Sequence, residues 1–169
     1  MSLDRIAVYD PGLSILGRPS FAFFEEFEQL VNSGDYPRAL TVMGRAVHPE
    51  DPGSKLPFGV ALAVNRAFLH TPIGRRLADL LPTAPPEVKR IFDQDGPASA
   101  YAGITAEVLL AAGSGSSPYF RQNCEAVAAA IPRGRAIVIQ HSSHNAASIA
   151  RKGFVQPFAE FFAGAARAA

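Results

Sequence analysis

Three short apolar runs constrain the fold of this chain more than any other feature. They are I-A-V-Y at residues 6–9, A-E-V-L-L-A-A at 106–112 and A-I-V-I-Q at 136–140. Each run ends in residues that favour turns or loops, at 10–12, 113–117 and 141–145. Runs of this length without apolar–polar alternation are typical of parallel strands that helices cover on both faces. The sequence therefore predicts an α/β fold with a partial parallel sheet of about three strands.

Helical patterns fill the remaining chain. A helix is expected at residues 118–131, with Pro118 near its first turn and with Phe120 and Cys124 on its inward face. This helix joins the second strand to the third as a right-handed crossover does. A last helix carries phenylalanines at 154, 158, 161 and 162.

About 90 residues separate the first run from the second, far more than a crossover needs. We interpret residues 13–103 as an inserted helical cap, and residues 1–12 and 104–169 as the sheet core of one domain. Ser20 is a candidate N-cap for the first cap helix. Prolines at 82–86 are expected to break the helix before them and to leave a short helix at 87–93.

The chemistry is expected where the strands end, because ligands gather outside the carboxyl ends of open parallel sheets. Asp10 follows the first run, and His144 lies in the loop after the third. A histidine that a strand places at this rim can accept and donate protons. Asp10 and His144 are therefore the candidate catalytic residues.

Three segments of the sequence resemble the α/β-hydrolase family. I-V-I-Q-H-S-S-H-N-A-A-S resembles the last strand and the catalytic-histidine loop, I-A-V-Y-D-P-G-L the sixth strand, and V-L-L-A-A-G-S-G-S-S-P-Y-F-R the seventh strand with its turn. The resemblance extends over most of the chain. It implies that the chain is the C-terminal half of such a fold, strands six to eight with a helical cap. It also places His144 on the catalytic histidine of the family.

The sequence departs from the family pattern at the other two triad positions. Ser116 stands where most members carry the triad acid, and a hydroxyl cannot stabilise an imidazolium as a carboxylate does. Some members take the acid from the end of the sixth strand, where this chain has Asp10. The alternative for Asp10 is a turn initiator before Pro11 and Gly12. No serine lies in a G-x-S-x-G motif, so the nucleophile is not expected in this chain.

Other candidate sites have simpler alternatives. His141 is interpreted as a structural neighbour of His144. The glycine–serine run at 113–117 resembles a phosphate-binding loop, but without a P-loop lysine a plain turn is the better interpretation. Cys124 is interpreted as a core residue. Phe21, Phe24 and Phe58 either belong to the core of the cap or line an apolar substrate pocket.

Composition narrows the partners and the location. With 16 Lys and Arg against 15 Asp and Glu, scattered along the chain, no nucleic-acid partner is expected. We also expect no cofactor. A metal site is not expected, because the chain has one cysteine and no third ligand is evident beside His141 and His144. The single cysteine fits a reducing compartment. No apolar run is long enough for a membrane span or signal peptide, so a cytoplasmic location is the prediction.

Two functions remain open from the sequence. The chain is either a component of an ester- or amide-hydrolysing enzyme that acts on a small apolar substrate, or a catalytically inactive, truncated module that binds a ligand or a protein. In either case the first strand would be an apolar edge with unpaired backbone groups. We expect it to pair with a companion that carries the N-terminal half of the fold, or with a second copy.

Overall fold

The structure is a computed structural model that describes residues 3–17, 20–47, 49, 51–144 and 146–164. The chain divides into two compact units. The sheet unit comprises Met1–Gly12 and Pro97–Ala169, and the helical unit comprises Leu13–Gly96. The second boundary therefore lies at residue 97, whereas the sequence placed it at 104. The short 3₁₀ helix η3 (Ala98–Tyr101) belongs to the sheet unit because it packs on the helix α6 (Pro118–Ala130). That the helical unit acts as a cap stays a prediction.

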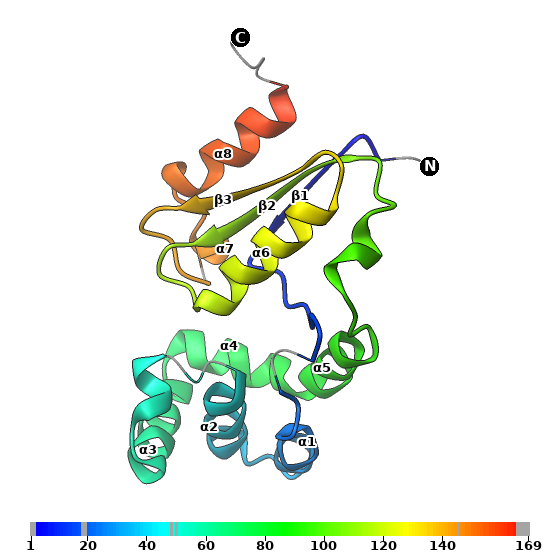
Figure 1. Ribbon diagram of the computed structural model, residues 1–169. Helices are drawn as coiled ribbons and strands as arrows, with labels where there is room; N and C mark the ends of the chain where they lie inside the picture. Colours follow the sequence, from blue (N-terminus) through cyan, green and yellow to red (C-terminus); the bar gives the residue numbers. More distant parts are fainter. Residues whose placement is uncertain (1–2, 18–19, 48, 50, 145, 165–169) are drawn as a thin grey trace. The chain divides into compact units, whose positions relative to one another are not determined.

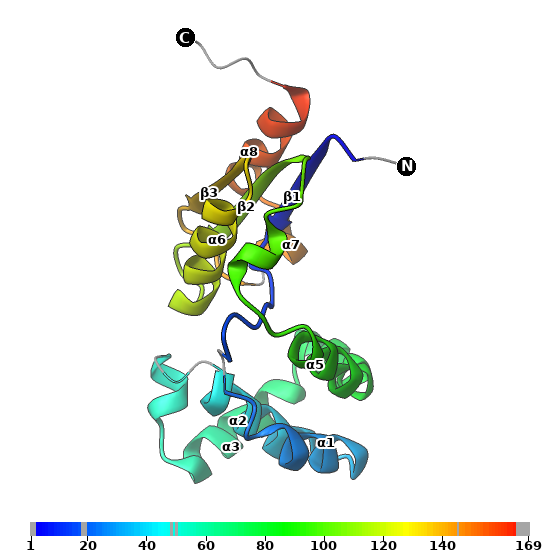
Figure 2. The same cartoon turned by 45° about the vertical axis from the view of Figure 1, so that its right-hand side comes forward.

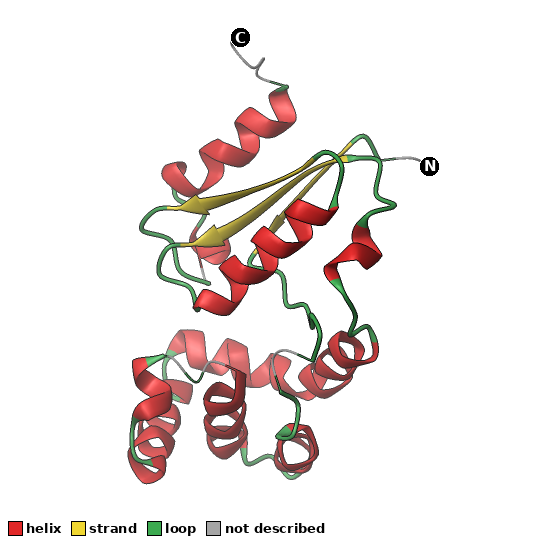
Figure 3. Cartoon of the chain, in the orientation of Figure 1, coloured by secondary structure: helices red, strands yellow, loops and turns green. Residues whose placement is uncertain are grey.

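The sheet confirms the parallel arrangement. In the described residues it consists of β1 (Arg5–Tyr9), β2 (Glu107–Gly113) and β3 (Gly134–Ile139), in the order β1-β2-β3 (Figures 1 and 3). Both pairs are parallel. Because of this arrangement, all three strands present their carboxyl ends at one edge of the sheet.

Burial differs between the strands. Leu109 and Ala111 in β2 are fully buried, whereas β1 is half-buried throughout. In β3 the side chains of Arg135 and Val138 are exposed. The sequence predicted strands that helices cover on both faces, and in β1 and β3 this cover is only partial. The reason is their position, since each forms an edge of this narrow sheet.

Two helices pack on opposite faces of the sheet (Figures 1 and 2). They are α6 (Pro118–Ala130) and α8 (Lys152–Ala163), and the short α7 (Ala146–Ile149) precedes α8. Arg5 ties the end of α8 to the sheet, because its Nη1 donates to the carbonyls of Phe161 and Phe162 while its Nε donates to Glu107 at 3.2 Å. The rings of Phe154 and Phe158 pack against Tyr9. Helices thus pack on both faces of the sheet.

The helical unit is built from short helices joined by tight turns. They are α1 (Phe24–Asn32), α2 (Tyr36–Val47), η1 (Pro52–Lys55), α3 (Phe58–Leu69), α4 (Pro72–Leu80), η2 (Leu81–Thr83) and α5 (Ala84–Asp93). The core of this unit gathers Phe23, Phe27, Val31 and Ala39. No helix in the described part of the chain is long and apolar enough to cross a membrane.

Two sequence predictions about these helices are wrong. The residue that precedes α1 is Phe23, without a side-chain cap, so Ser20 is not the N-cap. The last helix of the helical unit does not begin at residue 87, after the prolines at 82–86, as the sequence predicted. Instead α5 begins at Ala84 with Pro85 and Pro86 in its first turn, where the missing N–H groups have no helical partner to lose.

Candidate functional site

Asp10 is the centre of the candidate site. It follows the last residue of β1 with φ of +43°, a left-handed conformation that Asp adopts more readily than most residues. Its side chain is fully buried. Its Oδ1 accepts the backbone N–H of Gly113 at 3.1 Å, and its Oδ2 accepts the Ser116 hydroxyl at 2.5 Å. A carboxylate removed from water requires such donors, so these bonds join the end of β1 to the turn after β2.

His144 lies beside this carboxylate. Its Nδ1 is 3.4 Å from Oδ2 of Asp10, at the long end of the hydrogen-bonding range. Its ring stacks on Phe120 of α6, with ring centres 4.6 Å apart and planes inclined by 12°. Asp10 and Phe120 thus orient the ring. The His144 side chain is nevertheless 59% exposed, and its Nε2 is the ring nitrogen away from Asp10. The structure therefore brings together the two residues that the sequence selected as catalytic.

The loop that carries His144 is fixed by bonds to the neighbouring strands. The Tyr9 hydroxyl donates to the carbonyl of Ser143 at 2.6 Å, and Ser114 Oγ accepts the N–H of His141 at 2.9 Å. Burial raises the pKa of Tyr9, which keeps this phenol protonated and able to donate. His141 has φ of +57°, and its contribution to the site is its backbone turn, as a structural neighbour of His144 should provide.

Position 113 requires glycine because neighbouring atoms approach its backbone closely. A Cβ atom at this position would collide with the Ser142 carbonyl, the Tyr9 hydroxyl and Ser116 Oγ. Any side chain here would push the histidine loop away from the turn after β2.

The turn after β2 is not a phosphate-binding loop. Such loops need free backbone N–H groups that point at the anion. Here four consecutive N–H groups donate within the protein, to Asp10 Oδ1 and to the carbonyls of Ile139, Ser142 and Gly113. The interpretation as a plain turn is confirmed.

The predicted substrate-contacting phenylalanines lie in the helical unit. Phe21 and Phe24 both contact Phe92 and pack at the margin of the core of that unit. Phe58 begins α3, is 40% exposed and lies under the guanidinium of Arg38. Packing therefore accounts for Phe21 and Phe24, while Phe58 keeps an accessible ring.

Sequence reasoning missed the neighbours that orient the pair. Helical spacing predicts an inward position for Phe120, and the resemblance marks Ser116 only as a serine where most family members carry the triad acid. Their contacts with His144 and Asp10 join segments that are far apart in sequence, and periodicity carries no signal for such contacts. Pro118 indicated where α6 begins, but the sequence did not indicate that the ring of His144 would stack on Phe120.

No set of three or more metal-ligating side chains gathers in the residues that the structure describes. His48, which the sequence placed in the cap, lies outside those residues.

The fold has relatives among solved structures, although no family model matches the sequence and no curated protein does either. An α/β hydrolase from Sphaerobacter thermophilus superposes with a TM-score of 0.69 at 19% identity. A putative non-heme bromoperoxidase, BpoC, from Mycobacterium tuberculosis superposes with a TM-score of 0.52 at 21% identity. The chain has part of an α/β-hydrolase fold. Each superposition covers 95% of this chain but only 58% of the neighbour, and at these identities the likeness shows the fold alone.

Cys124 provides a test of the packing behind Phe120. The thiol is buried on α6, and desolvation, with Asp10 and Glu125 nearby, raises its pKa to about 12. Because only the thiolate reacts, the folded chain at pH 8 should react with a disulfide reagent far more slowly than the chain unfolded in urea. Stopped-flow thiol labelling measures both rates. Equal rates would contradict the packing of this helix on the sheet.

Proposed function

We propose that this chain is a component of an α/β hydrolase that cleaves an ester or amide of a small apolar substrate. His144 is the general base and Asp10 is the acid that orients it. The observation that supports the proposal is the buried Asp10 carboxylate beside Nδ1 of an exposed imidazole, at the carboxyl ends of parallel strands. Of the phenylalanines predicted to contact substrate, Phe58 has the accessible ring for this purpose.

The geometry suits proton transfer through the free nitrogen of the ring. With Nδ1 toward Asp10, Nε2 can take the proton from a serine hydroxyl as its oxygen forms a bond to the substrate carbonyl carbon. The imidazolium then returns that proton to the leaving alcohol or amine, and water releases the acid in a second step. Asp10 stays ionised throughout, and the bonds from Gly113 and Ser116 hold its carboxylate in place.

The serine in this proposal comes from outside the 169 residues. Ser116, the hydroxyl nearest the pair by its contacts, donates to Asp10 and not to His144, so it cannot lose its proton to the imidazole in this arrangement. The fold neighbours are longer than this chain, which spans 58% of their length. A companion segment with a nucleophile elbow would complete the site.

The second candidate is a catalytically inactive module that keeps the fold for binding. The 3.4 Å separation of Nδ1 from Oδ2 is compatible with it, since it is longer than the roughly 2.6–3.2 Å of a catalytic hydrogen bond, although such bonds tighten when substrate binds. The reading frame around this chain distinguishes the two candidates, since only the first requires a strand followed by G-x-S-x-G.

His144→Ala tests the proposed base. In the native polypeptide, or in this chain combined with the companion segment, hydrolysis of a p-nitrophenyl ester should fall by about 10²- to 10⁴-fold in kcat/KM, because general-base catalysis is lost. The matched control is His70→Ala, at the exposed C-cap of α3, which should keep the parent rate. A His144→Ala variant as active as the parent would refute the role of His144. A complete assembly without esterase activity would favour the binding module.

The companion would add to the sheet at β1. The N–H of Asp10 donates to Ala111 and the carbonyl of Asp4 accepts from Glu107, so even-numbered residues direct their backbone groups toward β2. Odd-numbered residues direct theirs to the other side, where the described residues form no further strand. An edge of this kind attracts another strand, either of the N-terminal half or of a second copy.

Proline substitutions in β1 test this edge. Ala7→Pro removes an N–H that faces away from β2, so it should abolish association while the sheet unit stays folded. Val8→Pro removes an N–H on the β2 side and should unfold the unit, which makes it the matched control. Sedimentation with circular dichroism measures both properties. A parent chain that is monomeric in dilute solution, and stays so with the companion present, would contradict the proposal.

A further inference from the structure

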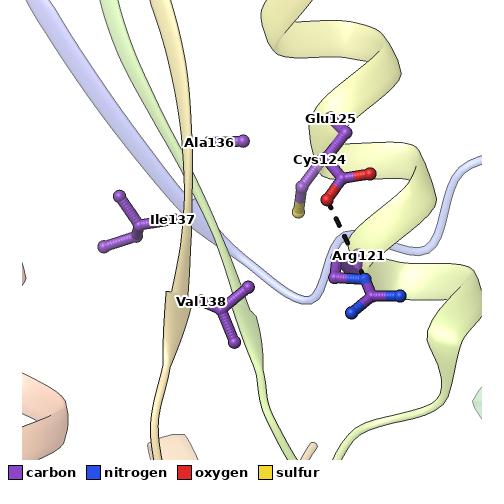
Figure 4. Close-up of a pocket in the computed structure, with 6 residues that line it drawn as sticks. All are labelled: Arg121, Cys124, Glu125, Ala136, Ile137 and Val138. Carbon is purple, nitrogen blue, oxygen red and sulfur yellow. Dashed lines mark ion pairs between the residues drawn. The ribbon is translucent and has the colours of Figure 1, made fainter.

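A cleft beside the Asp10–His144 pair, with which it shares Gly113 and Ser116, lies at the carboxyl ends of β2 and β3. Its volume is about 380 Å³, and Ser114, Ser116, Arg121, Val138 and Gln140 contribute to its lining. A narrower pocket of about 90 Å³ between α6 and β3 shares Arg121 and Val138 with it (Figure 4). Because the two pockets share these lining residues, we interpret them as the wide, polar part and the narrow part of one groove. The wide part has the size of a small-molecule site.

Arg121 is the charged side chain of the wide part. Its Nε lies 3.8 Å from the Glu125 carboxylate, and both side chains are more than half exposed, so this ion pair is weak (Figure 4). Arg121 has no other hydrogen bond or ion pair in the described part of the chain. A guanidinium presents paired donors that match the two oxygens of a carboxylate.

The serine hydroxyls of the cleft offer complementary groups. Ser114 Oγ accepts the N–H of His141, which leaves its hydrogen to donate into the cleft. Ser116 gives its hydrogen to Asp10 and presents only lone pairs. An anion is therefore favoured on the side of Arg121 and Ser114, and disfavoured on the side of Ser116.

The narrow part suits a short apolar chain. Ala136 and Val138 point toward α6, where Cys124 faces them, while Ile137 points away (Figure 4). Val138 is 39% exposed, so an apolar group there would cover surface that now faces water. The narrow part, of about 90 Å³, is smaller than the roughly 150 Å³ of a cavity that holds benzene, so it suits a chain of a few carbons.

We propose that the groove between α6 and β3 binds a small aliphatic carboxylate of the size of propionate or butyrate. The carboxylate pairs with Arg121 and accepts the Ser114 hydroxyl, and the alkyl chain lies against Val138 and Ala136. The site is distinct from the Asp10–His144 pair, and its test measures binding alone, so it does not depend on hydrolysis.

The test is a calorimetric and ¹⁵N NMR titration of the chain with acetate, propionate and butyrate at constant ionic strength. Binding should saturate, with shifts centred on residues 113–116 and 138–140, and should tighten about fourfold per added methylene as apolar surface is buried. Butyramide, which has the same chain without the charge, should bind at least tenfold more weakly than butyrate. Shifts that rise linearly without saturation, or equal binding of butyramide, would overturn the proposal.

Two variants and a control locate the site. Arg121→Gln should weaken butyrate binding at least tenfold, whereas Arg133→Gln, an exposed arginine in the turn before β3, should leave it unchanged. Val138→Asp should abolish the dependence on chain length. The NMR spectrum of each variant reports whether the fold is intact. Equal effects of the two arginine substitutions would show that the anion responds only to overall charge, and the proposal would fail.

Discussion

The buried carboxylate of Asp10 is the constraint on which the rest of the sheet unit depends. A charged group without solvent contact is costly unless donors surround it, and the donors here come from Gly113 and Ser116. They fix the turn after β2 against the end of β1. The same carboxylate lies beside Nδ1 of His144, which belongs to the loop after β3. The Asp10 side chain thus contacts the segments that follow β2 and β3. The stacking of His144 on Phe120 adds α6 to this arrangement.

The narrow sheet explains both the exposed surfaces and the proposed partners. Among the strands that the structure describes, only β2 has neighbours on both sides, so the fully buried apolar residues of the sheet concentrate there. β1 presents unpaired backbone groups, which suit a further strand. β3 presents the exposed Val138 beside α6, where we propose that a small carboxylate binds. The two outer strands therefore have different expected occupants, a polypeptide at the backbone edge of β1 and a small molecule between β3 and α6.

Much of this fold could be predicted from the sequence, because short apolar runs closed by turns identify parallel strands without any knowledge of tertiary contacts. The proximity of Asp10 to His144 was also predicted, since Asp10 directly follows the first parallel strand and His144 lies in the loop after the third. The start of α5 at Ala84 did not, because proline in a first turn and proline as a helix breaker look alike in a sequence. The contact of Ser116 with Asp10 depends on a left-handed residue at position 10, and no local pattern specifies that conformation.

The central claim is that the carboxylate of Asp10 holds the imidazole of His144 by Nδ1. A long-range ¹H–¹⁵N NMR spectrum of the histidine rings at a pH where they are neutral tests it most directly, because it reports which ring nitrogen carries the proton. The account predicts that His144 carries it on Nδ1, that Asp10→Asn removes this preference, and that the exposed His70 is unaffected by that substitution. A neutral His144 with its proton on Nε2 in the parent chain would contradict the account.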